Sequence, residues 1–169
     1  QKSFPLCCTW PDAIRGSEDD RPSWHYKDKP FWDNVAPHPL HEEETAVEAM
    51  ATNLAIANDP LASNSDKAKA LAWIGHVVGD VHQPLHATTR CSPPHPDGDR
   101  GGNDFRLNLS KWSITPGNLH KFWDSVGLAL HPDPPMSKVE AFAQAVEAEF
   151  PAASFGADVE QPNIEVWLE

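Results

Sequence analysis

The sequence contains no long hydrophobic run, and none of its apolar stretches approaches the ~18 residues that a membrane-spanning helix needs. It also has no basic segment followed by an apolar one at its start, so we expect that any signal peptide has been removed or omitted. No internal repeat and no low-complexity tract is visible in the 169 residues. We therefore predict one domain over residues 1–169 and no membrane span.

Positive charge is scarce. The chain has 13 Lys and Arg residues against 25 Asp and Glu residues, which gives a formal net charge of −12. This balance argues against diffuse electrostatic binding to nucleic acid, because such binding needs basic side chains along the phosphates. A nucleic-acid substrate held at one local cationic site remains possible, since bound metal ions can reverse the sign of the charge there.

Cysteine is scarce too, with Cys7, Cys8 and Cys91 as the three thiols. One disulfide could join Cys91 to either Cys7 or Cys8 and would leave an odd thiol. The count leaves a disulfide and free buried thiols equally open.

Nine glycines stand against seventeen prolines, which is typical of helices joined by stiff loops. We predict a mainly α-helical domain with long irregular loops at 17–40 and 87–117 and at most a short hairpin, whose arm would be 105–109. Caps are expected at Ser63, Ser65 or Asp66, at Asn118 and at Ser137. The expected helices are 11–16, 41–58, about 64–81, 119–130, one after Ser137 with an apolar face of Val139, Phe142, Ala143, Val146 and Phe150, and 164–169.

The segment 75–86, GHVVGDVHQPLH, is the centre of the sequence. His76 and Asp80 are four residues apart and therefore share one face of a helix. Pro84 ends that helix, because the residue before a proline is driven out of the helical region, and His86 follows just past the end. Histidine and aspartate are ligands of zinc. His82 lies about 600° around the helix from His76, so we expect it to point away in a supporting role.

A second pair, His120 and Asp124, repeats the spacing of four on another predicted helix. One such pair is usually a surface hydrogen bond. Two pairs together with His86, in a chain of nine histidines, favour a metal site. The histidines at 38, 41, 95 and 131 stand beside prolines or charges and are expected to be exposed.

Two upstream residues, Asp12 and His25, are further candidates. Taken singly, Asp12 is more typical of a first-turn helix carboxylate and His25 of a hydrogen-bonded histidine among aromatics. The full set is too large for one tetrahedral ion and would hold two, with positions left open for water. Two such ions lower the pKa of a bridging water and clamp the oxygens of a phosphoester displacement. The set is Asp12, His25, His76, Asp80, His86, His120 and Asp124.

Five blocks of sequence, in the same order, resemble the zinc-dependent single-strand-specific nucleases (nuclease S-one/P-one type). These enzymes belong to a superfamily shared with bacterial zinc phospholipases C. The resemblance implies a mostly helical fold, three zinc ions in a cleft, and cleavage of single-stranded DNA and RNA to 5′-phosphorylated products, with 3′-nucleotidase activity. The blocks are Trp10–Arg15, Ser23–Asp28, Gly75–His86, Gly101–Asn103 and Asn118–Asp124.

The resemblance also implies a role for each matching residue. One zinc would be held by Asp12, His25, His76 and Asp80. A second zinc would be held by His86, His120 and Asp124. Asp80 would be shared with the third zinc and counts among the catalytic residues.

Substrate contacts follow from the same resemblance. Arg15 would stabilise charge developing on the phosphate. Tyr26 would stack on a base, although without the resemblance it is more typical of a core aromatic. Asp28 would accept from the edge of the base or orient the attacking water, and Asn103 would add contacts. Stacking contributes ~1–3 kcal/mol per base and tolerates every sequence.

The chain departs from the family at its start. Family members begin with a tryptophan whose amino group, with a nearby histidine, holds the third zinc, whereas this chain begins at Gln1 and has no histidine before His25. The family also continues into further helices beyond Trp167-Leu168-Glu169. We therefore expect a fragment at both ends, two zinc ions on the residues present, and a third if the missing segment supplies ligands.

Three functions compete. The first is a zinc nuclease acting on single-stranded DNA, RNA and nucleotides, which we expect to be a monomer and to be secreted or periplasmic. The second is a zinc phospholipase C, whose members carry glutamate in place of Asp124 and lack the 101–103 block. The third is a non-enzymatic metal-binding module, which would need closed coordination. The residues favour the nuclease.

Overall fold

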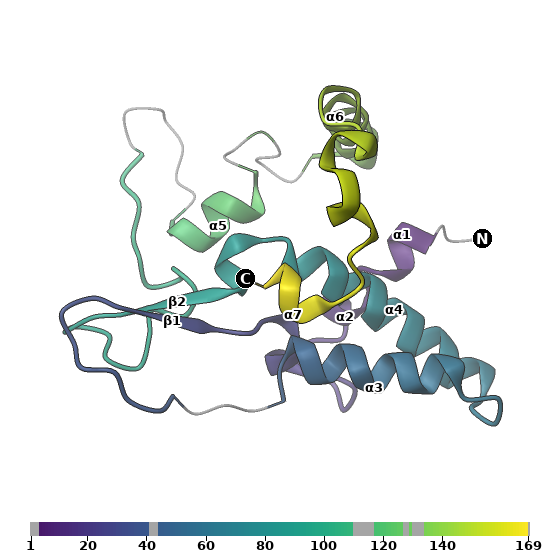
Figure 1. Ribbon diagram of the computed structural model, residues 1–169, viewed down its shortest axis with the longest axis horizontal. Coiled ribbons are helices and arrows are strands. Elements are labelled where there is room, and N and C mark those ends of the chain that lie inside the picture. The colour runs from purple at the N-terminus through teal and green to yellow at the C-terminus, as the bar shows by residue number, and fades with distance from the viewer. Residues whose placement is uncertain (1–3, 41–43, 110–116, 127–128, 130–133, 169) are drawn as a thin grey trace.

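The computed structural model describes residues 4–40, 44–109, 117–126, 129 and 134–168. Within these ranges helices predominate, which confirms the mainly α-helical prediction (Figure 1). None of these helices combines the length and apolarity that a bilayer crossing needs. The helices are α1 (Phe4–Cys7), α2 (Trp10–Ala13), α3 (Ala46–Asn58), α4 (Asn64–Val81), α5 (Leu119–Asp124), α6 (Met136–Glu149) and α7 (Ile164–Trp167), with 3-10 turns at Pro22–His25, Pro84–His86 and Ala152–Glu160.

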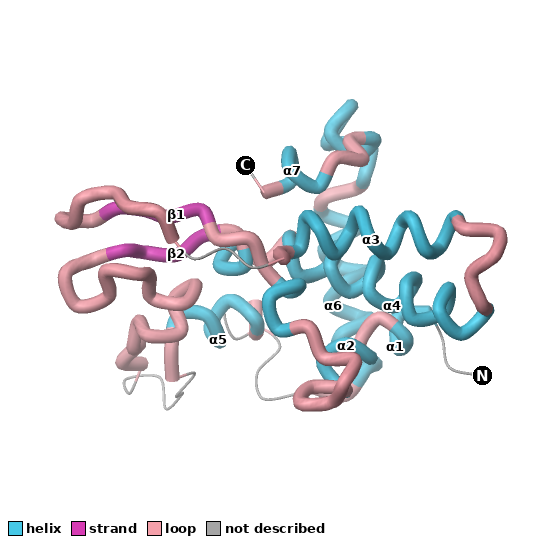
Figure 2. Tube along the Cα trace, turned by 90° about the horizontal axis from the view of Figure 1, so that it is seen from below, coloured by secondary structure: helices cyan, strands magenta, loops and turns pink. Residues whose placement is uncertain are grey.

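Helices α3 and α4 lie side by side as a hairpin and form the main body of the molecule (Figures 1 and 2). Thr45 begins α3 through a capping box with Glu48, so the described start is Ala46 and not the predicted 41; residues 41–43 lie outside the described ranges. Ser63 begins α4, because its hydroxyl accepts from Asp66 N at 3.1 Å. Of the three predicted caps Ser63 is therefore the one used, and the predicted end near Val81 is confirmed.

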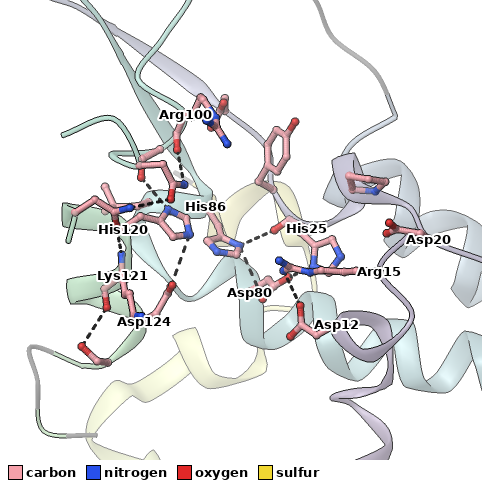
Figure 3. Close-up of a pocket in the computed structure, with 18 residues that line it drawn as sticks. Asp12, Arg15, Asp20, His25, Asp80, His86, Arg100, His120, Lys121 and Asp124 are labelled. Carbon is pink, nitrogen blue, oxygen red and sulfur yellow. Dashed lines mark hydrogen bonds and ion pairs between the residues drawn. The ribbon is translucent and has the colours of Figure 1, made fainter. Parts of the chain in front are cut away.

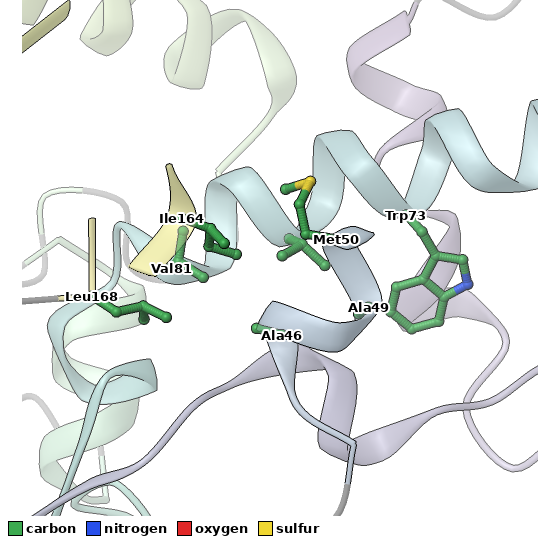
Figure 4. Close-up of a cluster of buried hydrophobic side chains, with 8 residues drawn as sticks. Ala46, Ala49, Met50, Trp73, Val81, Ile164 and Leu168 are labelled. Atoms are coloured by element: carbon green, nitrogen blue, oxygen red, sulfur yellow. The ribbon is translucent and has the colours of Figure 1, made fainter. Parts of the chain in front are cut away.

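The hydrophobic core lies between these two helices and α7 (Figure 4). Small residues on α3, Ala46 and Ala49, are fully buried and let the helix approach Val77 of α4 closely. Ile164 and Leu168 cover the end of α4 near Val81. Burial of one such aliphatic side chain contributes roughly 1.5–3 kcal/mol. This core fixes α4, which carries His76 and Asp80.

Two strands replace parts of the predicted loops. β1 (Lys29–Trp32) pairs in parallel with β2 (Thr88–Cys91), with Lys29 opposite Thr88. Parallel strands need a long crossover, and here α3 and α4 supply it. The predicted strand at 105–109 is wrong, since its described pairing is one isolated bridge between Arg106 and Asn118.

Other boundaries also differ from the predictions. α5 ends at Asp124, before the predicted 130, and part of the predicted extension lies outside the described residues. α6 begins after Pro135 without a side-chain cap, so the Ser137 cap is wrong. The predicted apolar face of α6 is half-buried only at Val139 and Phe142 and is otherwise exposed. The cysteines Cys7, Cys8 and Cys91 are all free.

Candidate metal centre

A cleft of about 860 Å³ is lined by all of the predicted site residues except His76, which lies buried behind it (Figure 3). Its walls come from α2, the 22–28 segment, the end of α4, the turn at Pro84–His86, the 100–103 loop and α5. These segments are far apart in sequence. The α3–α4 core and the β1–β2 pair bring them together.

The first group of possible ligands consists of Asp12, His25 and His76, whose ligand atoms all lie within 4.8 Å of one another. Asp80 stands one helical turn after His76. Its Oδ2 is 2.9 Å from His25 Nδ1 and 3.0 Å from His76 Nε2. Those two nitrogens are themselves 2.8 Å apart. The structure thus places together the four residues predicted for one zinc ion.

The second group consists of His86, His120 and Asp124, again with ligand atoms within 4.8 Å of one another. The rings of His86 and His120 are stacked with centroids 4.9 Å apart. Asp124 Oδ1 lies 3.7 Å from His120 Nε2 and accepts from Gln83 Nε2 at 3.0 Å. The break at Pro84 turns the chain so that His86 faces α5.

Asp80 lies between the two groups, with His25 on one side and His86 on the other (Figure 3). Its Oδ1 is 3.8 Å from His86 Nδ1, while its Oδ2 contacts the first group. Burial raises the pKa of this carboxyl, but hydrogen bonds from His25 and His76 and the nearby imidazoles outweigh burial and lower the pKa to about 2. Asp80 is therefore ionised and available to both groups at neutral pH.

Three of the histidines are oriented by backbone carbonyls. His76 Nδ1 donates to Cys8 O at 2.9 Å, His86 Nδ1 to His25 O at 2.7 Å, and His120 Nδ1 to Gly101 O at 2.8 Å. A carbonyl only accepts, so each Nδ1 carries a proton, and in the neutral ring Nε2 keeps the lone pair. Metal-binding histidines are held by this kind of second hydrogen bond.

The first group fits a metal ion on its chemistry. His76 Nε2 lies close to both His25 Nδ1 and the Asp80 carboxylate, so two imidazole nitrogens and one carboxylate oxygen converge on one point. His25 Nε2, the other nitrogen of that ring, is buried with no hydrogen-bond partner among the described residues. Imidazole and carboxylate donors without cysteine suit zinc at a catalytic site. The donor set therefore fits zinc.

The predicted base-binding residues line the same cleft. Tyr26 is 41% exposed there, and Asp28 is half-buried. Burial and the negative charge of Asp99 raise the pKa of Asp28 from 3.8 to about 6, against smaller opposing effects of His120 and Lys27. Asp28 can therefore carry or release a proton near neutral pH.

Asn103 lines the cleft as well, but its side chain has partners within the protein. Its Nδ2 donates to Arg100 O at 2.9 Å, and its Oδ1 accepts from Asn118 Nδ2 at 3.3 Å. Asn118 caps α5, whose Lys121 N donates to its side chain at 2.8 Å. Asn103 thus supports the helix that carries His120, and its contact with a base stays a prediction.

Arg15 extends from the end of α2, and its Nη2 lies 2.7 Å from Asp12 Oδ1 (Figure 3). The sequence reasoning missed two further cations on the cleft wall, Arg100 and Lys121. Their position next to Gly101 and His120 in the sequence was the available signal. With Arg15 they place positive charge in a cleft of an acidic protein.

The remaining described histidines lie away from the two groups. His82 Nδ1 donates to Val78 O at 2.6 Å, and its ring packs against Trp167. His38 and His95 were expected to be exposed, but both are half-buried beside aspartates: His38 Nε2 is 3.1 Å from Asp97, and His95 Nδ1 is 4.0 Å from Asp104. A neighbouring carboxylate explains why each can be partly covered.

Comparison with known proteins gives one family. A family model described as S1/P1 Nuclease matches residues 1–169, which confirms the resemblance seen in the motifs. The chain is 29% identical to endonuclease 4 of Arabidopsis thaliana over 135 residues, covering 70% of this chain and 41% of that protein. It is 26% identical to endonuclease 3 over 132 residues, covering 70% and 40%. Endonuclease 2 is 37% identical over 57 residues, covering 34% and 16%. The chain thus spans about two fifths of the length of endonucleases 3 and 4.

Proposed function

The chain belongs to the S1/P1 nuclease family, and from this premise we propose that it is a zinc-dependent nuclease acting on single-stranded DNA and RNA. The proposed products carry 5′-phosphates, and 3′-nucleotides are a further proposed substrate. The observation that carries the proposal is the pair of His/Asp groups on either side of Asp80.

We assign zinc to both groups, one ion to each. Asp12, His25, His76 and Asp80 would hold the first ion. The second would be held by His86, His120 and Asp124. When bound, zinc supplies Lewis-acid chemistry, polarising a phosphoryl oxygen and making water a stronger nucleophile at neutral pH. A third ion, if the whole protein has one, would need ligands from outside the described residues.

The cleft's own side chains suit a phosphodiester. Arg15, Arg100 and Lys121 line it and can bind the phosphate oxygens, although the whole chain has a net charge of −12. Arg15 is the proposed stabiliser of charge that develops on phosphorus, because it reaches the first group through Asp12. Five aspartates line the same cleft, so local binding of a phosphodiester there would depend on bound metal ions, which can reverse the sign of the local charge.

The proposed base-binding residues, Tyr26 and Asp28, line the same cleft. The exposed ring of Tyr26 offers a face on which a base can stack, which needs an unpaired strand. Asp28 lies two residues further along and can accept from or donate to the edge of that base, because its pKa of about 6 allows both protonation states near neutral pH. Orientation of the attacking water is a second possible role for Asp28.

The test is hydrolysis by the zinc-loaded protein of single-stranded DNA, RNA, 3′-AMP and phosphatidylcholine vesicles. The expected result is cleavage of the nucleic acids and the nucleotide, with loss of activity on chelation. His76→Ala should abolish cleavage, because it removes a nitrogen of the first group. His82→Ala, on the same helix but turned toward Trp167, is the matched control and should remain active.

Two outcomes would contradict the proposal. Cleavage of phosphatidylcholine without cleavage of nucleic acid would show that the protein is a phospholipase and not a nuclease. Full activity of the His76→Ala protein would show that the first group takes no part in the reaction. We also propose that the protein is secreted or periplasmic, which cell fractionation would test. We propose that it is a monomer, which its mass in solution would test.

A further inference from the structure

We propose that Asp99 is a positioning residue for the second group: its buried carboxylate fixes the backbone turn whose carbonyl orients His120. The inference rests on the proposed function in one respect, because it takes His120 to be a zinc ligand. Asp99 lies outside both ligand groups, and none of its contacts reaches their ligand atoms directly.

Asp99 is 6% exposed, and one of its oxygens gathers several donors. Oδ1 accepts from Arg90 N at 3.0 Å and from Gly102 N at 3.0 Å, and the Thr89 hydroxyl donates to it at 3.4 Å. Arg90 and Thr89 belong to β2, whereas Gly102 belongs to the cleft loop. A single carboxylate oxygen thus ties the loop to the sheet.

The turn itself is tight and depends on glycine. Gly101 and Gly102 have φ of +60° and +76°, in the left-handed region that glycine favours. A Cβ on Gly101 would stand 2.3 Å from Leu85 O, so the loop lies directly against the turn that precedes His86. Thr89 Oγ1 also accepts from Gly101 N at 3.4 Å. The backbone at 101–102 is therefore held from two sides, by β2 with Asp99 and by Leu85.

This held turn supports His120 in two ways. Gly101 O accepts from His120 Nδ1 at 2.8 Å, which fixes the tautomer and the plane of the ring. Gly102 O accepts from His120 N at 3.4 Å, which ties the start of α5 to the same loop. Loss of the partner behind a metal-binding histidine typically weakens metal affinity 10–100-fold.

Burial of the Asp99 carboxylate removes it from water, which by itself lowers the stability of the fold. A buried carboxylate needs compensation, and the ion pairs among the described residues leave Asp99 out, so its compensation comes from neutral donors. Its charge also lies close enough to Asp28 to act on that carboxyl. The convergence of neutral donors on one buried oxygen is explained if an acceptor of fixed position is needed at the base of the loop.

Three substitutions separate acceptor position from charge. Asp99→Asn keeps an oxygen at the Oδ1 position and removes the charge. Asp99→Glu keeps the charge and displaces the oxygen by one methylene. Asp99→Ala removes both. Asp104→Asn is the matched control, since Asp104 belongs to the same loop but pairs with His95 and Arg100.

The primary measurement is zinc affinity, from competition with a chromogenic chelator, for the wild type and the four variants. Asp99→Glu and Asp99→Ala should weaken one of two ions roughly 10–100-fold and leave the other unchanged. Asp99→Asn and Asp104→Asn should bind both ions as the wild type does. Circular dichroism of the metal-free proteins checks folding, and if the Ala variant fails to fold, the Asn and Glu variants decide.

A second readout does not need zinc. Nitrogen-15 NMR of metal-free protein reports the tautomer of His120, which should be protonated at Nδ1 in the wild type and in Asp99→Asn, and mixed in Asp99→Glu. Wild-type affinity for both ions and an unchanged tautomer in Asp99→Glu would overturn the proposal. So would a selective loss in Asp99→Asn alone, which would assign the effect to charge. If the wild type bound no zinc, the proposed function would fail, and the tautomer would still decide the role of Asp99.

Discussion

Three of the four histidines in the two groups are oriented by the main chain. His76, His86 and His120 each donate from Nδ1 to a backbone carbonyl, of Cys8, His25 and Gly101. In the sequence, the spacing of four made His76 and His120 candidates, because residues four apart share a helix face, and the break at Pro84 added His86. Spacing could not predict their acceptors, since every residue carries a carbonyl and only the fold decides which one is near.

At this scale Asp28 gives a prediction about pH. Its pKa is about 6 in the folded protein and 3.8 ordinarily, so the neutral form is favoured by folding. This contribution to stability is complete below the ordinary pKa and is lost as the pH rises through about 6. Asp28→Asn cannot ionise, and the metal-free variant should exceed the wild type in free energy of unfolding by roughly 1–3 kcal/mol above pH 7.

Urea unfolding from pH 4 to pH 8, with a chelator present, measures this difference. The gap should widen from about pH 4 to pH 6 and become nearly constant above pH 7. Glu140→Gln, at an exposed carboxylate on α6, is the control and should follow the wild type. A gap that stays constant with pH would contradict the account of Asp28.

Among the elements, helices α3 and α4 begin at specific capping residues. Thr45 closes a capping box with Glu48, and its side chain is buried with the core at 5% exposure. Thr45→Ala should therefore lower the free energy of unfolding by about 1 kcal/mol, within a usual range of roughly 0.5–2. Chemical denaturation measures the change. Ser65→Ala in the first turn of α4 is the control, because Ser63 and not Ser65 is the cap there, and an equal loss in both would contradict the assignment.

The sequence predicted the helices better than the strands, for physical reasons. Helix α4 has a cap, a continuous apolar pattern and a proline stop, all within one local stretch. β1 and β2 have only four residues each, and β1 contains Pro30. Each strand is stabilised by the other, and α3 and α4 separate the two in the sequence. Such pairing is a property of the whole fold, which local pattern does not report.

For α6 the sequence predicted more packing than the structure has. Its apolar residues predicted a packed face, yet Val146 and Phe150 are 42% and 54% exposed. Periodicity describes which side chains share a face. It does not supply the surface that covers them.

Across the whole molecule, Trp73 links the core to the first group. It is 4% exposed, packs within the α3–α4 core, and its ring lies 5.3 Å from that of His25 and 6.0 Å from that of His76. Trp73→Ala should lower the free energy of unfolding by roughly 3–5 kcal/mol. It should also weaken the first zinc ion more than the second, because only the first group loses packing behind its histidines.

Denaturation of the metal-free variant and zinc competition on the folded protein measure the two effects. Trp123→Ala is the matched control, since Trp123 is 45% exposed on α5 beside the second group. That variant should cost far less stability. Equal weakening of both ions in Trp73→Ala would show that the aromatic packing supports the fold but not the first group.

The position of Asp80 between the two groups of ligands could not be predicted from local sequence patterns. Spacing identified His76 with Asp80 and His120 with Asp124, and the likeness to the family assigned the partners. The contact of Asp80 with both His25 and His86 arises because the chain turns at Pro84 and returns beside α4. That geometry depends on three segments at once, and no local pattern contains it.

The most direct test of the account is the zinc content of the purified protein, measured by mass spectrometry after removal of loosely bound metal. The account predicts two ions per chain for the wild type, one each for His25→Ala and His120→Ala, and weakened retention of both for Asp80→Asn. A single ion in the wild type, lost equally in His25→Ala and His120→Ala, would contradict two groups joined by Asp80.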